Sequence, residues 1–176
     1  RNNQPVSGRE QVYDKDSVLI SHTDESGLIT FVNDDFINVS GFAAEELIGQ
    51  PHNMIRHPDM PSEIFRDTWA TLKRGRPWSG IIKNRSRNGD HYWVEAHATP
   101  VRENGAITGY MSVRRKPTRA QIEAAGHAYA LFRDGKADRD FDDFIRELQA
   151  EPSQAAGEIL VFVDECHRTQ SGRLLA

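Results

Sequence analysis

Apolar and polar residues alternate along three stretches in the middle of this chain, Trp78–Arg85, His91–Val101 and Ala106–Arg115. Alternation with a period of two is typical of β-strands that bury one face. The connectors between these stretches contain Asn88-Gly89 and Asn104-Gly105, and Asn-Gly is the strongest short-range signal for a tight hairpin. The pattern therefore predicts an antiparallel meander of three strands.

Two shorter apolar runs, Val18–Thr23 and Leu28–Val32, flank a turn-forming Asp-Glu-Ser-Gly sequence and predict another hairpin. Helical spacing of apolar residues predicts four helices, over residues 33–40, 43–48, 62–74 and 119–133. The order of two strands, short helices and three strands is typical of an α+β fold, in which an antiparallel sheet carries helices on one face. Residues 136–150 predict one more amphipathic helix.

Strand alternation also predicts which side chains of the meander point inwards. On its first two strands the inward set is Trp78, Gly80, Ile82, Asn84, Tyr92, Val94, Ala96 and Ala98. Its small members, Gly80 opposite Ala96 and Ala98, favour space for a ligand, although neighbouring side chains that fill this space are the alternative. His91 and His97 fall on the opposite face, where we expect solvated side chains.

The last strand of the meander carries an arginine in an unusual position. Arg114 shares a face with Tyr110 and Ser112. An arginine directed into the core would be costly without an anionic partner.

The segment Gln50–Pro61 contains three prolines, which exclude a regular helix or strand through it. Between the prolines it carries the polar residues His52, Arg56, His57 and Asp59 beside apolar ones. A rigid, irregular segment with converging polar groups is suited to line a ligand site. The alternative is an ordered connector in which Arg56 and Asp59 pair with each other or with nearby backbone.

Composition limits the classes of protein that the chain can belong to. Of 176 residues, 27% are charged and 38% are hydrophobic, which is typical of a soluble globular protein. The net charge of −4 gives no basic face for nucleic acid. There is no apolar run of about 18 residues and no secretory signal, so we expect no membrane insertion. A single cysteine, Cys166, is compatible with the cytoplasm.

Four ordered stretches resemble one known family: Gly49–Pro61, Pro77–Gly80, Lys83–Arg85 and Asn88–Val94. Together with the order of elements they resemble the PAS sensor domain of bacterial aerotaxis receptors over about residues 16–117. The resemblance implies a PAS fold, which is an α+β fold with a five-stranded antiparallel sheet and short helices on one face. A C-terminal helical extension would follow, and the cofactor would be FAD.

The resemblance also implies a set of cofactor-binding residues, namely Asn33, Arg56, His57, Asp59, Trp78 and Asn84. Arg56 could meet a pyrophosphate or a ring carbonyl through charge-assisted hydrogen bonds. Trp78 could stack on the flavin ring, and Asn84 offers the donor and the acceptor that a flavin pyrimidine edge requires.

The function that this resemblance implies is sensing rather than catalysis. We expect a homodimeric module that reports redox or oxygen state to downstream receptor domains or chemotaxis proteins. The alternatives are a cofactor-free PAS module for protein interaction, and a haem domain with His57 as axial ligand. Light sensing of the LOV type is excluded, because it requires a cysteine beside the flavin and residues 1–165 contain none.

The C-terminal residues belong to a different pattern. Asp164-Glu165-Cys166-His167 follows an apolar run and resembles motif II of superfamily 2 helicases, most closely the motor subunit of type I restriction enzymes. Because the chain has no Gly-x-x-x-x-Gly-Lys-Ser/Thr phosphate loop, we expect a fragment, a fusion or a chance apolar strand rather than an ATPase.

The sequence thus divides into a flexible or loosely docked arm (1–15), the PAS domain (16–117), a helical connector (118–150) and a tail (151–176). A full aerotaxis receptor would also carry a membrane anchor and a long coiled coil. Neither pattern occurs here, so we expect at most the sensor module of such a receptor or a soluble relative.

Overall fold

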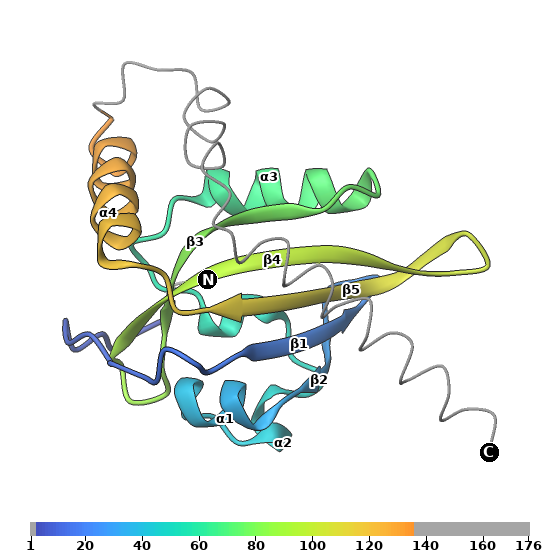
Figure 1. Ribbon diagram of the computed structural model, residues 1–176, viewed down its shortest axis with the longest axis horizontal. Coiled ribbons are helices and arrows are strands. Elements are labelled where there is room, and N and C mark those ends of the chain that lie inside the picture. Colours follow the sequence, from blue (N-terminus) through green and yellow to red (C-terminus); the bar gives the residue numbers. More distant parts are fainter. Residues whose placement is uncertain (1–2, 136–176) are drawn as a thin grey trace.

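The computed structural model describes residues 3–135, which form one antiparallel sheet with five helical segments (Figure 1). The elements are β1 (Leu19–Asp24), β2 (Ile29–Val32), α1 (Asp34–Ser40), α2 (Ala44–Leu47), the 3₁₀ helix η1 (His52–Ile55), α3 (Ser62–Lys73), β3 (Trp78–Arg85), β4 (His91–Glu103), β5 (Ala106–Arg115) and α4 (Arg119–Arg133). The expected helix at 136–150 and the tail lie outside the described residues. No helix within residues 3–135 is long and apolar enough to cross a membrane.

The strands are arranged in the order β2-β1-β5-β4-β3, and all neighbours are antiparallel. Both predicted hairpins are confirmed, and Gly80 pairs with Ala96 as the alternation indicated. The two hairpins are joined through the pairing of β1 with β5, for example Ser21 with Ser112. The predicted α+β fold with a five-stranded sheet is therefore confirmed.

The segments between β2 and β3 pack on one face of the sheet. They bury Phe36, Leu47, Ile55 and Ile64 against Tyr92 and Val94 of β4 in a single hydrophobic core. Removing such side chains from water stabilises the fold by roughly 1.5–3 kcal/mol each. The helix α4 instead covers the opposite face, where Tyr129 stacks on Trp93 with ring centroids 6.4 Å apart and donates a hydrogen bond to the carbonyl of Ile81.

The N-terminal arm is docked along its length, so the prediction of a flexible or loosely docked arm is wrong for its described part. The Asn3 amide donates to the carbonyls of Asn53 and Arg56 at 2.9 and 2.8 Å. Further along, the Tyr13 hydroxyl donates to the carbonyl of Trp93 at 2.7 Å. Backbone hydrogen bonds to the β3–β4 hairpin run between these two anchors, and such ladders are not visible in amino-acid composition.

The expectation that His91 and His97 are solvated is also wrong. Both are half-buried, and the arm pairs with His91 through the backbone bridge between Glu10 and His91. His91 packs edge-on against His57, and Nδ1 of His97 lies 2.7 Å from the hydroxyl of Ser79. The pKa of each histidine lies below its ordinary value, and burial is the largest cause.

Asn33 begins α1 and ties it to β1. Its side-chain oxygen accepts from the backbone N–H groups of Phe36 and Ile20, and its amide donates to the carbonyl of Val18 at 2.7 Å. One asparagine thereby supplies hydrogen-bond partners for backbone groups at the first turn of α1 and at the start of β1.

We expect Asn33→Ala to lower the free energy of unfolding by about 1–3 kcal/mol, because a helix cap and two further partners are lost. Urea denaturation measures the change. The matched control is Asn38→Ala on the exposed face of the same helix, for which we expect a change within about 0.5 kcal/mol. Equal effects of the two substitutions would contradict this role of Asn33.

Candidate functional site

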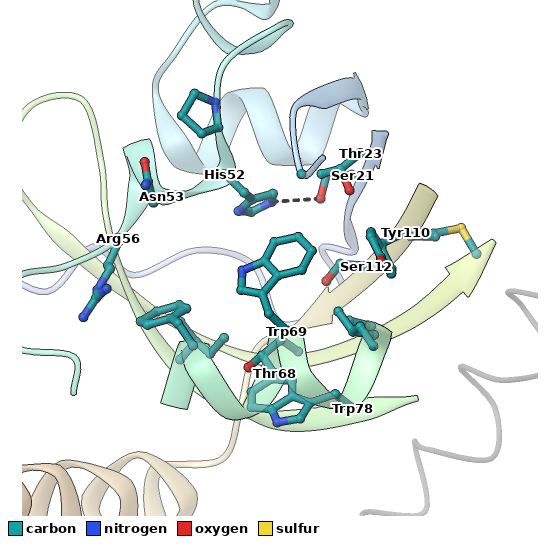
Figure 2. A pocket seen from close by; sticks show the side chains of 18 of the residues that line it. Ser21, Thr23, His52, Asn53, Arg56, Thr68, Trp69, Trp78, Tyr110 and Ser112 are labelled. Carbon is teal, nitrogen blue, oxygen red and sulfur yellow. Dashed lines mark hydrogen bonds between the residues drawn. The ribbon is translucent and has the colours of Figure 1, made fainter. Parts of the chain in front are cut away.

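A cavity of about 430 Å³ lies between the inner face of the sheet and the segments η1 and α3. Figure 2 shows its lining, with His52 facing Ser21 and the Trp69 indole between His52 and Trp78. The sheet contributes Ser21, Thr23, Trp78, Ile82, Ala96, Ala98, Tyr110, Met111, Ser112 and Arg114, and the other segments contribute Ser26, Gly27, Pro51, His52, Asn53, Arg56, Phe65, Arg66, Thr68, Trp69 and Leu72. The volume is in the range of roughly 300–1,000 Å³ that is usual for small-molecule sites.

The inner end of the cavity contains a buried arginine. Arg114 is 6% exposed and donates to Oγ of Ser21 at 3.0 Å and to Nε2 of His52 at 2.8 Å. No carboxylate pairs with it among the described residues. Burial lowers the pKa of Arg114 to about 10, so the guanidinium remains charged at neutral pH.

His52 is the neutral partner of this arginine. Burial, followed by the charge of Arg114, lowers the pKa of His52 to about 3. A neutral imidazole can accept from the guanidinium, whereas an imidazolium cannot. The inner end of the cavity therefore presents one uncompensated positive charge, held in place by a hydroxyl and an imidazole.

Aromatic side chains line the middle of the cavity. The indole N–H of Trp78 donates to a carboxylate oxygen of Asp67 at 2.9 Å, which fixes the ring. Trp69 meets Tyr110 edge-on with ring centroids 5.3 Å apart. It also touches the β1–β2 turn at Gly27, where φ is +88° and a Cβ would lie 3.0 Å from the indole. These rings form flat apolar surfaces suited to a planar ligand.

The interpretation of Gly80 as open space needs correction. A Cβ at this position would lie 2.5 Å from the ring of Trp78. The glycine therefore accommodates the tryptophan, not a ligand. Ala96 and Ala98 do line the cavity, as their small size suggested.

Of the six residues that the resemblance implied, two line this cavity, namely Arg56 and Trp78. Arg56 lies at its edge (Figure 2), where the guanidinium covers the Phe65 ring at 4.3 Å and donates to the carbonyl of Met60 at 2.9 Å. Burial, against the charge of Glu63, lowers the pKa of Arg56 from its ordinary value.

The remaining four lie outside the cavity lining. Asn33 caps α1, and Asn84 is buried where its backbone pairs with that of Arg56. His57 and Asp59 lie beyond Arg56 in the same segment, and the Asp59 carboxylate pairs with Lys83 at 2.7 Å. A direct contact of these four with a cofactor stays a prediction.

The set of residues implied by the resemblance left out Ser21, His52 and Arg114, although His52 was among the polar groups of the proline-rich segment expected to line a ligand site. Strand alternation put Arg114 on one face with Tyr110 and Ser112, which also line the cavity, and this was the available signal. The partners could not be found in the same way, because Ser21 and His52 come from β1 and η1 and meet Arg114 only in the folded chain.

The family model described as "PAS fold" matches residues 29–114. Over 124 residues the chain is 52% identical to the aerotaxis receptor of Escherichia coli strain K12. The aligned region covers 70% of this chain and 24% of the receptor. The chain thus spans about a quarter of the length of this relative.

Solved structures agree with this family. A PAS domain from Colwellia psychrerythraea is 28% identical, with a TM-score of 0.53, covering 58% of this chain and 87% of that one. The LOV domain of the blue-light photoreceptor Aureochrome1 shares the fold with a TM-score of 0.56 at 17% identity, covering 60% of this chain and 85% of that one. Residues 29–114 of this chain therefore form a PAS domain, and the chain is similar over 124 residues to the aerotaxis receptor of Escherichia coli.

Proposed function

We propose that the cavity binds a flavin, with FAD as the expected form, and that the chain is a sensor module that reports redox or oxygen state to a chemotaxis pathway. The observation that carries this proposal is the uncompensated charge of Arg114 at the inner end of an aromatic cavity. A buried cation without an anionic partner is costly, so its presence favours a ligand that brings negative charge or strong acceptors. The 52% identity to a receptor named for aerotaxis supports the signalling role.

A flavin supplies a planar ring that takes up electrons and gains negative charge at its polar edge on reduction. Arg114 would stabilise that charge by charge-assisted hydrogen bonds. His52 and Ser21 would hold the guanidinium in position, since each accepts a hydrogen bond from it. Trp78, Trp69 and Phe65 would flank the ring and exclude water from it.

Two rival readings are less well supported. A haem domain rested on His57, yet this residue does not line the cavity and its ring packs against His91. A cofactor-free interaction module requires that side chains fill the space beside Ala96 and Ala98, whereas a cavity of about 430 Å³ lies there. Homodimerisation, binding to downstream chemotaxis proteins and the absence of catalysis remain part of the proposal.

The visible absorbance spectrum of the purified chain, before and after mixing with FAD, tests the proposal. We expect the bands of protein-bound oxidised flavin. A haem Soret band, or a colourless protein that ignores FAD, would contradict it.

We expect Arg114→Met to weaken FAD binding by about 10- to 100-fold, since a hydrogen bond to a charged group contributes about 1.5–3 kcal/mol. Fluorescence titration with FAD measures the affinity. The domain should stay folded, because Oγ of Ser21 and Nε2 of His52 lie 3.1 Å apart and can pair with each other once the guanidinium is removed. The matched control is Arg115→Met, the next residue on the opposite face of β5, which should bind FAD as the wild type does. Unchanged affinity in Arg114→Met would remove this arginine from the site.

Arg56→Ala should weaken FAD binding by about tenfold, equivalent to about 1.4 kcal/mol, because a cation at the edge of the cavity is lost. The same titration applies. Arg74→Ala serves as control, since Arg74 is an exposed arginine at the end of α3 and lies outside the lining. A loss of affinity of equal size in both variants would point to general electrostatics instead of a local contact.

A further inference from the structure

The segment that bounds the cavity beside β3, residues 56–60, has two chemically different sides. We call it the wall segment. On one side Arg56 lines the cavity. On the other, Asp59 is 47% exposed and lies outside the lining. Pro58 lies between these two residues and fixes its own φ, which removes one of the backbone rotations that separate them.

The wall segment is fastened to the free edge of β3. Arg56 and Asn84 form an isolated antiparallel bridge, and the backbone N–H of Lys83 donates to the sulfur of Met60 at 3.3 Å. Asp59 adds a charged contact at the same place, since its carboxylate accepts from Nζ of Lys83 at 2.7 Å. The Lys83 side chain is 15% exposed, so this pair is partly shielded from solvent and salt.

The same aspartate reaches α4. Nη1 of Arg133, in the last turn of the helix, donates to the backbone carbonyl of Asp59 at 3.3 Å and lies 3.9 Å from its carboxylate. The other end of α4 is held differently, because Arg119 forms a two-pronged ion pair with Glu10 of the N-terminal arm at 2.9 and 3.0 Å. The helix thus has one charged contact with the arm and another with the wall segment.

Asp59 is in the charge state that these contacts need. Partial burial raises its pKa, but the hydrogen bond and charge of Lys83, with the charge of Arg133, outweigh burial and hold the pKa below its ordinary value. His57 contributes geometry as well, because its Nδ1 accepts the backbone N–H of Asp59 at 3.1 Å.

We propose that Asp59 is a positioning residue that couples the wall segment of the cavity to the end of α4, and that it does so through Lys83 and Arg133 without touching the cofactor. A ligand that shifts Arg56 would displace Asp59 and loosen or tighten the last turn of α4. The stimulus in this scheme rests on the proposed function, whereas the coupling itself is a property of the chain alone. It gives Asp59 a role other than the cofactor contact that the family resemblance implied.

Coupling between two sites is reciprocal, so it can be tested without any flavin. Hydrogen exchange of the full chain reports the wall segment through the N–H groups of Arg56, Asp59 and Met60, all of which are hydrogen-bonded. We expect Arg133→Ala to accelerate exchange at these amides by roughly two- to fivefold, the range that a partly exposed ion pair supports. His127→Ala is the control, because His127 is exposed on the same helix, lies outside the contacts with the wall segment and the arm, and should leave the wall segment unchanged.

Adding FAD extends the test. In the wild type, FAD should alter exchange at the last turn of α4, and Arg133→Ala should abolish that change while FAD affinity stays within about twofold of the wild type. The inference is overturned if Arg133→Ala leaves the wall amides as in the wild type, or if His127→Ala accelerates them equally. A chain that binds no FAD but shows the reciprocal effect would refute the proposed function and keep the coupling.

Discussion

The charge of Arg114 inside an apolar fold is the constraint on which the arrangement of the site depends. A guanidinium in this position must have acceptors, and it obtains them from Ser21 of β1 and His52 of η1. These contacts join both hairpins and the proline-rich segment at one point. The sheet order supports this, since β1 is paired directly with β5 and so brings Ser21 beside Arg114. The cavity remains polar at this end for the same reason.

Much of the fold could be predicted from local patterns. The bounds of β3, β5 and α4 match the predicted ranges, because alternation, Asn-Gly turns and the Thr118 cap are local signals. The arm could not be predicted, since its hydrogen bonds join residues 50 to 109 positions apart. The burial of His91 could not be predicted for the same reason. Alternation predicts on which face of the sheet His91 lies, but the segment that covers this residue comes from a distant part of the chain.

The candidate site shows a similar division. Arg56 and Trp78 line the cavity, and the resemblance had implied both. The structure gives His57 and Asp59 contacts on the far side of the same segment, so adjacency in sequence did not mean a shared direction. Neighbouring residues in a proline-rich segment can point to opposite sides, as successive residues of a β-strand do. A motif therefore identifies a functional segment more reliably than it identifies the atoms that touch a ligand.

The docked arm has a consequence for how such domains can be exchanged between receptors. Asn3 holds the carbonyls of Asn53 and Arg56, and Glu10 holds the first turn of α4. The arm therefore contacts both a segment that lines the cavity and the helix α4. A chimaera whose junction lies at β1 would contain the cavity without the hydrogen bonds that the arm supplies. The junction should therefore lie before Asn3, so that the arm is transferred with the domain.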